Sequence, residues 1–375
     1  MLPSDTKKLV LFGAGKIGRS FIGQLFSRSG YEVVFIDIDQ QVIKALNQKR
    51  SYKVYICDTN PETIIVENVR GVLVSDIDAV IDEIVTADIL AVSVGKNGLK
   101  HIVPTLSHAL LKREARYPGS MLDIILAENM RNADKFLRDA LLNNLPDDYP
   151  LDQRIGLIET SIGKMVPLIV NKQDDDILSV SAEAYNTLIV NKEAFKKPLP
   201  SILGMEAKEN MKAWVDRKLF IHNFGHAATA YIGYKKHPEL IYLWEVLEDD
   251  KIRIFVKSAM LQSAEALQHE YPGVFTEQHL NEHIDDLIRR FSNIYLGDTI
   301  FRVGCDLYRK LSPDDRIITP LATAKKYGLP YDNIEEVLKA ALSFNATGPD
   351  GQMYPSDIDF RKELKEKGEH FIYTI

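Results

Sequence analysis

A glycine-rich turn between an apolar run and a helical pattern constrains this chain more than any other feature. Residues 8–12 form a short apolar run that predicts a buried strand, and residues 17–29 have helical spacing. Between them, Gly13 would permit a tight turn, Gly15 would let a pyrophosphate approach the backbone, and Gly18 would allow close packing of helix on strand. The start of the helix would bind the anion through its free N–H groups and partial positive charge. The predicted dinucleotide-binding turn consists of Gly13, Ala14, Gly15, Lys16, Ile17 and Gly18.

A carboxylate at the end of the next apolar run, residues 32–36, indicates which dinucleotide binds. Asp37 lies 19 residues after Gly18, where a carboxylate accepts hydrogen bonds from a ribose 2′-hydroxyl and repels a 2′-phosphate. The sequence therefore predicts NAD rather than NADP as the cofactor, with Asp39 as an alternative or additional ligand. Ser93 and Val94 follow a further apolar run and would border the cofactor, although an ordinary turn explains them equally well.

The pattern of apolar residues divides the chain into two parts. In the first half, strand and helix patterns alternate, which predicts a parallel sheet with crossover helices. Further strand candidates are residues 89–94, 121–126, 177–182 and 188–190. The proline-containing stretch 196–200 resembles a linker, and helical spacing dominates afterwards, over residues 207–234, 252–271, 277–291 and 334–342. We therefore expect a doubly wound α/β domain over residues 1–200 and an all-α domain over residues 201–375.

Composition and charge exclude several classes of protein. With 46 basic and 53 acidic residues the net charge is −7, so the chain has no general attraction for nucleic acid or anionic membranes. Two cysteines, Cys57 and Cys305, provide neither a disulfide framework nor a cysteine-rich zinc site, and their scarcity fits a reducing compartment. No apolar run reaches the roughly 20 residues that span a bilayer. We expect a cytoplasmic protein, a monomer or small homo-oligomer, without nucleic-acid or membrane partners.

A second group of candidate residues lies in the helical half. Lys218, Asn223 and His226 can face one side of a helix. Because apolar residues surround Lys218, desolvation could bring its pKa to roughly 7–8, where an amine exchanges a proton at neutral pH. Asn223 and His226 could donate hydrogen bonds to a carbonyl oxygen and polarise it for hydride attack. Spacing alone fits a solvated lysine and capping or core polar groups at least as well.

Several segments resemble the long-chain polyol dehydrogenase family, within the mannitol dehydrogenase superfamily. Residues 11–23 are similar to that family's cofactor segment, and residues 217–231 to its catalytic segment. The family pattern of lysine, four residues, asparagine, two residues and histidine matches Lys218, Asn223 and His226. Residues 128–130 and 290–312 are also similar, and the Arg-Lys-Leu-Ser stretch at 309–312 looks more like the phosphate-sugar branch than the free-hexitol branch.

The resemblance implies a metal-free reaction between an NAD-binding domain of the Rossmann type and a helical domain. It makes Lys218 the general base for alcohol oxidation and the acid for ketone reduction, with Asn223 and His226 holding the reacting oxygen. The substrate would be a small sugar phosphate or polyol. Its candidate ligands are Asn129 and, for an anionic end, Arg302, Arg309 and Lys310. Helix capping or solvated salt bridges are the alternative for the three basic residues.

One departure from the family pattern concerns the substrate. Where the family usually has Asp-Arg before a Val-Pro pair, this chain has Gly163 and Lys164, then Met165-Val166-Pro167. A carboxylate expected near the sugar hydroxyls is therefore missing. This leaves open a related activity on a free hexitol or a hexuronate. A protein of another class, an NAD-binding sensor without turnover, is disfavoured by the complete set of lysine, asparagine and histidine.

Overall fold

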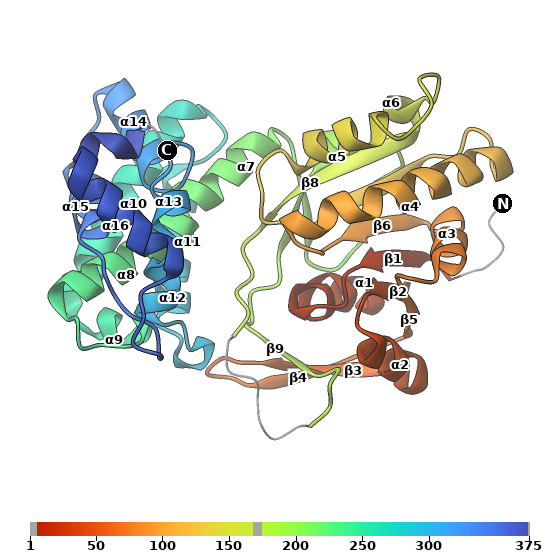
Figure 1. Ribbon diagram of the computed structural model, residues 1–375, viewed down its shortest axis with the longest axis horizontal. Coiled ribbons are helices and arrows are strands. Elements are labelled where there is room, and N and C mark those ends of the chain that lie inside the picture. The colour runs from red at the N-terminus through yellow and green to blue at the C-terminus, as the bar shows by residue number, and fades with distance from the viewer. Residues whose placement is uncertain (1–5, 168–174, 374–375) are drawn as a thin grey trace. The chain divides into compact units, whose positions relative to one another are not determined.

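The computed structural model describes residues 6–167 and 175–373, which form two compact units. The first unit comprises residues 1–214 and the second residues 215–375, so the division falls within helix α7 (Met211–Arg217). The first is built on a largely parallel sheet and the second on helices (Figure 1). The predicted fold class is confirmed. The domain boundary predicted at residue 200 stays a prediction.

The main sheet has eight strands in the order β11-β10-β8-β7-β6-β1-β2-β5. From β8 to β5 all neighbours are parallel, β10 runs antiparallel to β8, and β11 is parallel to β10. The order from β5 to β8 is that of a doubly wound dinucleotide-binding sheet, with its reversal point between β1 and β6. The strands are β1 (Lys8–Phe12), β2 (Glu32–Asp37), β5 (Val69–Leu73), β6 (Ile89–Val92), β7 (Leu122–Leu126), β8 (Ile155–Ile162), β10 (Leu188–Asn191) and β11 (Met205–Lys208).

Alternating side chains of the central strands build two cores, one on each face of the sheet. On β1, Leu9 and Leu11 pack into the core shared with α1 (Gln24–Arg28) and α2 (Gln40–Lys49). Val10 and Phe12 pack into the opposite core, with the helices α3 (Ile77–Val85), α4 (Lys96–Arg116) and α5 (Ala133–Leu142). Because successive strand residues point to opposite faces, burial on both sides explains why these strands are continuously apolar.

A smaller sheet of three strands belongs to the same unit. Its order is β4-β3-β9, with β3 (Ser51–Ile56) antiparallel to β4 (Glu62–Glu67) and parallel to β9 (Val180–Ala182). The strand predicted over residues 177–182 is therefore only partly present.

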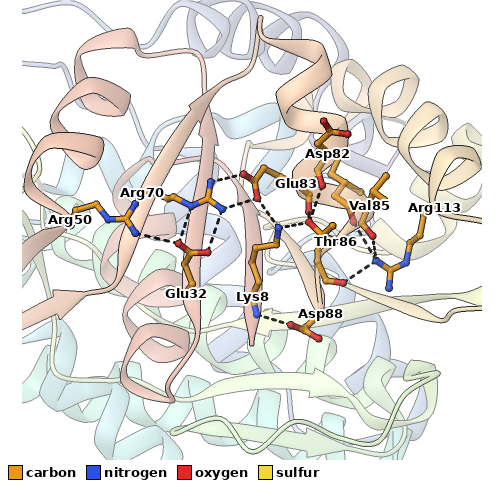
Figure 2. A network of polar contacts seen from close by, with 12 residues as sticks. Lys8, Glu32, Arg50, Arg70, Asp82, Glu83, Val85, Thr86, Asp88 and Arg113 are labelled. Atoms are coloured by element: carbon orange, nitrogen blue, oxygen red, sulfur yellow. Dashed lines mark hydrogen bonds and ion pairs between the residues drawn. The ribbon is translucent and has the colours of Figure 1, made fainter. Parts of the chain in front are cut away.

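A network of ion pairs holds the amino ends of the strands (Figure 2). Arg70 of β5 pairs with Glu32 of β2 at 2.9 Å and with Glu83 of α3, which also pairs with Lys8 of β1 at 2.7 Å. Arg113 donates hydrogen bonds to the carbonyls of Val85, the last residue of α3, and of Ala87 just beyond it. These partly buried contacts tie strands and helix together at the edge away from the glycine-rich turn, which follows the carboxyl end of β1.

The second unit consists of helices around α8 and α10. The helical pattern predicted from residue 207 begins only at Met211, because residues 205–208 pair with β10 as a strand. Over the described residues, no helix has the length and apolar character needed to cross a membrane. The longer helices are α8 (Phe224–Lys236), α10 (Asp250–Glu270), α11 (Glu277–Phe291), α14 (Ile318–Tyr327), α15 (Asp332–Leu342) and α16 (Pro355–Lys367), and the short ones used below are α12 (Ile300–Gly304) and α13 (Leu307–Lys310).

Candidate active site

The glycine-rich turn lies at the carboxyl end of β1, beside the loop after β6. Gly13 has φ +100°, and a Cβ there would lie 2.2 Å from the carbonyl oxygen of Ser93. A Cβ at Gly18 would lie 2.1 Å from the carbonyl oxygen of Gly13. These two glycines therefore serve the compactness of the turn, although Gly18 is packed against the turn itself more closely than against the strand.

Gly15 differs from its two neighbours in the motif. It is exposed, its φ is not positive, and a Cβ there would meet no atom within 4 Å. The fold therefore does not require glycine at this position, whereas a ligand that must approach the backbone does. Lys16 is also exposed, and its ammonium lies 3.3 Å from the Pro167 carbonyl.

The two aspartates at the carboxyl end of β2, Asp37 and Asp39, have separate roles. Asp39 caps α2 by accepting hydrogen bonds from the amides of Gln41 and Val42 at 2.9 and 3.1 Å. Asp37 instead joins β2 to the glycine-rich turn, because its Oδ2 accepts from the Ala14 amide at 2.5 Å. Its neighbour Ile38 is 81% exposed, an apolar side chain with no core to cover. Oδ1 of Asp37 also accepts from the Asp39 amide at 2.9 Å. Asp37 is the better candidate for a ribose ligand because its carboxylate contacts the glycine-rich turn, whereas that of Asp39 caps α2.

The loops after β6 and β7 are joined by a residue that the sequence reasoning did not single out. Glu128 is buried, and its Oε1 accepts from the amides of Val94 and Gly95 at 2.7 and 3.0 Å. Burial raises the pKa of this carboxyl, and the two amide hydrogen bonds oppose that shift. The contacts hold Val94 and Gly95, directly after Ser93, near the reversal point of the sheet. Asn129, the predicted substrate ligand, follows directly and is exposed.

Both motif segments contain a single turn of π-helix, called a π-turn below, where the sequence pattern predicted regular α-helix. The first spans Gly18–Gly23 and the second Lys218–Asn223, between α7 and α8. Each turn has a carbonyl that accepts a hydrogen bond from a hydroxyl elsewhere in its own unit: Tyr52 donates to Arg19 at 2.7 Å, and Ser263 of α10 donates to Phe220 at 2.6 Å. π-Turns are rare and are found frequently at functional sites.

Exposure to solvent distinguishes the three candidate catalytic residues, Lys218, Asn223 and His226, from their neighbours in the sequence. From residue 216 to residue 233 every residue is buried except these three, which are all partly exposed. Burial lowers the pKa of Lys218 to about 8, the charge of Arg316 adds to that shift, and Asp315 opposes it. The second unit therefore combines an amine that can exchange protons near neutral pH with two polar side chains in an apolar setting.

His226 is held by a carboxylate and an aromatic ring. Its Nε2 lies 2.9 Å from Oδ2 of Asp298, and its ring stacks on Phe291 with centroids 4.9 Å apart. The other carboxylate oxygen of Asp298 pairs with Arg302 on α12. Asp298 is only 6% exposed. The structure thus connects the predicted catalytic histidine to Arg302, a predicted substrate ligand, through one buried carboxylate.

The remaining basic candidates differ in how they are engaged. Arg309 is half exposed and pairs with Asp306 at 2.5 Å. Lys310 is buried, and its ammonium donates to the carbonyls of Val303, at 2.7 Å, and Cys305. These contacts favour a structural role for Lys310, holding the end of α12. Arg316 is buried and paired with Asp315 at 2.6 Å. It was not predicted from the sequence, because its proximity to Lys218 arises from tertiary packing.

Lys164, at the departure from the family pattern, is also enclosed. Its ammonium donates to the carbonyls of Glu183 and Tyr185 and to the amide oxygen of Asn186, at 2.7–3.1 Å. These three acceptors use all the donors of an ammonium group. Lys164 therefore serves the packing of the first unit. Among the described residues, no three His, Cys, Asp or Glu side chains are grouped so that they could hold a metal ion.

Fold and site together define a dinucleotide-binding α/β unit joined to a helical unit in which Lys218 is a partly exposed lysine among buried neighbours. Comparison with known proteins gives the family. The mannitol dehydrogenase Rossmann domain matches residues 7–204, and the mannitol dehydrogenase C-terminal domain matches residues 210–369. The chain belongs to the mannitol dehydrogenase family.

Solved structures with the same fold agree in architecture. Mannitol 2-dehydrogenase of Pseudomonas fluorescens, in a ternary complex with NAD and D-mannitol, has a TM-score of 0.73 at 15% identity, covering 94% of this chain and 82% of that one. A D-sorbitol dehydrogenase in substrate-free form has a TM-score of 0.76 at 15% identity, covering 98% and 97%. At this identity the likeness establishes the fold.

Proposed function

We propose that this protein is an NAD-dependent, metal-independent dehydrogenase that interconverts mannitol 1-phosphate and fructose 6-phosphate. The observation that carries the proposed chemistry is the set of Lys218, Asn223 and His226, the only partly exposed residues between residues 216 and 233. Membership of the mannitol dehydrogenase family supports the reaction class. It is also supported by the structurally similar mannitol 2-dehydrogenase, which was solved with NAD and D-mannitol bound. The basic residues Arg302 and Arg309, both substantially exposed, support an anionic substrate end.

The first unit fits a dinucleotide by its own geometry. Gly15 leaves open space where a phosphate needs to approach, Asp37 presents a carboxylate beside the turn, and Ile38 offers an exposed apolar surface for an adenine ring. Asp37 favours NAD, because a 2′-phosphate would meet its negative charge. Bound NAD would supply the acceptor for the hydride of the carbinol carbon.

The second unit supplies the proton transfer. In alcohol oxidation, neutral Lys218 takes the hydroxyl proton at Nζ, and in ketone reduction the Lys218 ammonium returns it to the oxygen. The pKa of about 8 lets both forms be present near neutral pH. The amide of Asn223 can donate a hydrogen bond to the reacting oxygen as negative charge develops there. Arg302 and Arg309 would bind the phosphate through their guanidinium groups.

The test is a comparison of substrates under identical conditions. Reduction of fructose 6-phosphate by NADH is measured beside fructose, fructuronate and tagaturonate. We expect the highest kcat/KM for fructose 6-phosphate. An equal or higher value for an unphosphorylated ketose would overturn the phosphate assignment while leaving the reaction class in place.

A related activity is the alternative, and a specific observation favours it. Gly163 leaves the first unit without the carboxylate that the family pattern places near the sugar hydroxyls, and Lys164 is occupied by three acceptors. A mannitol 2-dehydrogenase or a fructuronate or tagaturonate reductase would use the same lysine, asparagine and histidine, with a carboxylate able to replace a phosphate at the basic residues. The substrate panel above separates these activities.

A sensor without turnover is tested by one variant. Lys218→Ala is expected to lose turnover by a factor of about 10² to 10⁴ while NAD binding is retained, because only the proton-transferring group is removed. Near-normal turnover in this variant would contradict the role of Lys218, and absence of turnover in the unmodified protein with every substrate of the panel would favour the sensor.

A further inference from the structure

His226 is attached to its surroundings through one particular ring nitrogen. Nε2 meets Oδ2 of Asp298 at 2.9 Å, and the ring is stacked on Phe291. Nδ1 has no hydrogen-bond partner within the described part of the chain. Asp298 is itself fixed, because Arg302 pairs with its second oxygen. The orientation of the imidazole is therefore set from two sides.

The proton on the imidazole can be assigned from the chemistry of the pair. Burial would raise the pKa of Asp298, but the hydrogen bond and charge of His226 and the charge of Arg302 hold that pKa below its ordinary value. Asp298 is thus a carboxylate, which only accepts. Burial is the largest influence on the pKa of His226 and lowers it; the hydrogen bond and charge of Asp298 oppose this shift, Arg302 and Arg316 add to it, and the net pKa lies below the ordinary value. A neutral ring facing a carboxylate carries its single proton on Nε2.

We propose that Asp298 is a positioning residue that fixes His226 in the Nε2–H form, so that Nδ1 accepts a hydrogen bond from a substrate hydroxyl. This inference rests on the proposed function and changes the expected role of His226. A nitrogen lone pair repels a ketone oxygen, so His226 does not stabilise the reacting carbonyl; Asn223 does. We assign the hydroxyl that Nδ1 binds to the carbon beside the reacting one, because His226 lies three residues after Asn223 and residues at this spacing are neighbours on a helix surface.

The inference specifies the substrate class. A polyol and its ketose keep the neighbouring hydroxyl in both directions of the reaction, and a simple secondary alcohol does not have it. A site built to hydrogen-bond a hydroxyl rejects the analogue that lacks it, since the buried polar group is left unpaired. We therefore expect His226 to be the residue through which the site discriminates against a substrate lacking this hydroxyl.

The direct test is the tautomer of His226 in the free protein. With ¹⁵N-labelled histidine, long-range ¹H–¹⁵N spectra distinguish Nε2–H from Nδ1–H imidazole, and the signals of His226 are assigned by their loss in His226→Gln. We expect Nε2–H in the unmodified protein and a mixture of both forms in Asp298→Asn, whose amide can donate as well as accept. An Nδ1–H ring in the unmodified protein, or an unchanged spectrum in Asp298→Asn, would overturn the proposal.

A kinetic test uses a matched pair of variants. Asp298→Asn should lower kcat/KM about 10- to 100-fold, by analogy with metal-binding histidines, for which the loss of the outer hydrogen-bond partner has an effect of this size. The control is Asp249→Asn. Asp249 lies 3.4 Å from His237 and caps α10, a role that asparagine fills equally well, so kcat/KM should be unchanged. Equal losses in both variants would indicate a general structural effect and contradict the proposal.

A substrate comparison links the effect to the hydroxyl. The unmodified enzyme should prefer a substrate over its deoxy analogue lacking the neighbouring hydroxyl by about 10-fold or more. In His226→Ala the ratio of kcat/KM for the substrate to that for its deoxy analogue should fall to nearly 1. A ratio equal to that of the unmodified enzyme would overturn the proposal. If no polyol or ketose is turned over at all, the proposed function fails, and the tautomer measurement still decides the arrangement of His226 and Asp298.

Discussion

The hydroxyl of Ser263 donates a 2.6 Å hydrogen bond to the carbonyl of Phe220, inside the π-turn Lys218–Asn223. Ser263 is completely buried on α10, so this bond connects the turn with a helix that packs against it. Ser263→Ala should lower kcat about 10-fold, because Lys218 and Asn223 lose a fixed relation to each other, and should cost about 1 kcal/mol of stability. Steady-state kinetics with urea unfolding would measure both effects.

Thr323 provides the control for this prediction. Its hydroxyl donates a 2.9 Å hydrogen bond to the Thr319 carbonyl within α14, outside the π-turn. Thr323→Val should alter stability by a similar amount without changing kcat. If Ser263→Ala loses stability but keeps the kcat of the unmodified enzyme, the hydrogen bond does not position the catalytic turn.

The pKa of Lys218 predicts opposite pH dependences for the two directions of the reaction. Its value of about 8 arises mainly from burial, with a contribution from Arg316. Above that pH the neutral amine prevails, so kcat/KM for alcohol oxidation should rise with pH and level off above about 8. The corresponding value for ketone reduction should fall over the same range, because it needs the ammonium. Matched pH profiles in both directions would measure this.

Arg316 gives a way to test the cause of that pKa. Removing its charge in Arg316→Gln takes away one of the influences that lower the pKa of Lys218. Both pH profiles should therefore move to higher pH. Profiles that stay in place would assign the titration to another group.

The sequence predicts the fold well where short-range patterns and tertiary packing agree. The continuous apolar runs around residues 8–12 and 32–36 are β1 and β2, because strands buried on both faces have no polar side. The predicted helix over residues 277–291 is α11 with the same bounds, starting at the Thr276 cap. Residues 205–208, in contrast, extend the sheet beside β10, a long-range pairing that helical spacing does not reveal.

In the candidate site, too, the sequence predicts the features that local patterns determine and not those that arise from long-range contacts. The glycine motif and the spacing of Lys218, Asn223 and His226 are local, and sequence reasoning finds them. The π-turn at Lys218–Asn223 and the contact of Asp298 with His226 depend on residues that lie 40 or more positions away. No spacing rule reports them. Arg316 is missed for the same reason, since its proximity to Lys218 arises from tertiary packing.

Gly15 should separate cofactor binding from folding. A methyl group at this position meets no atom within 4 Å, so Gly15→Ala should leave the free energy of unfolding unchanged or raise it by about 0.4–1 kcal/mol. NAD affinity should fall, because the methyl group stands where the pyrophosphate approaches. Gly13→Ala should behave oppositely and destabilise the fold by about 1–2 kcal/mol or more, since its φ is +100°. Calorimetric NAD titration would contradict the prediction if Gly15→Ala bound as tightly as the unmodified protein.

Asp37 should control the choice between NAD and NADP. Asp37→Ala removes a charged hydrogen-bond acceptor worth about 1.5–3 kcal/mol, so the preference for NAD should fall roughly 10- to 100-fold. Asp39→Asn is the matched control, because asparagine can keep the cap of α2. The preference of this variant for NAD over NADP should equal that of the unmodified enzyme. The ratio of kcat/KM with the two cofactors measures this. A large change in Asp39→Asn alone would transfer the role to Asp39.

Lys310 is expected to serve stability rather than substrate binding. Its buried ammonium donates to the carbonyls of Val303 and Cys305, and burial lowers its pKa to about 8. Lys310→Met would leave both carbonyls without this donor and should lower the free energy of unfolding by about 1–3 kcal/mol. The KM for fructose 6-phosphate should change little, whereas Arg309→Met should raise it without a comparable loss of stability, because the Arg309 side chain is half exposed. A normal unfolding midpoint combined with a raised KM for the phosphorylated substrate alone would instead return Lys310 to the phosphate site.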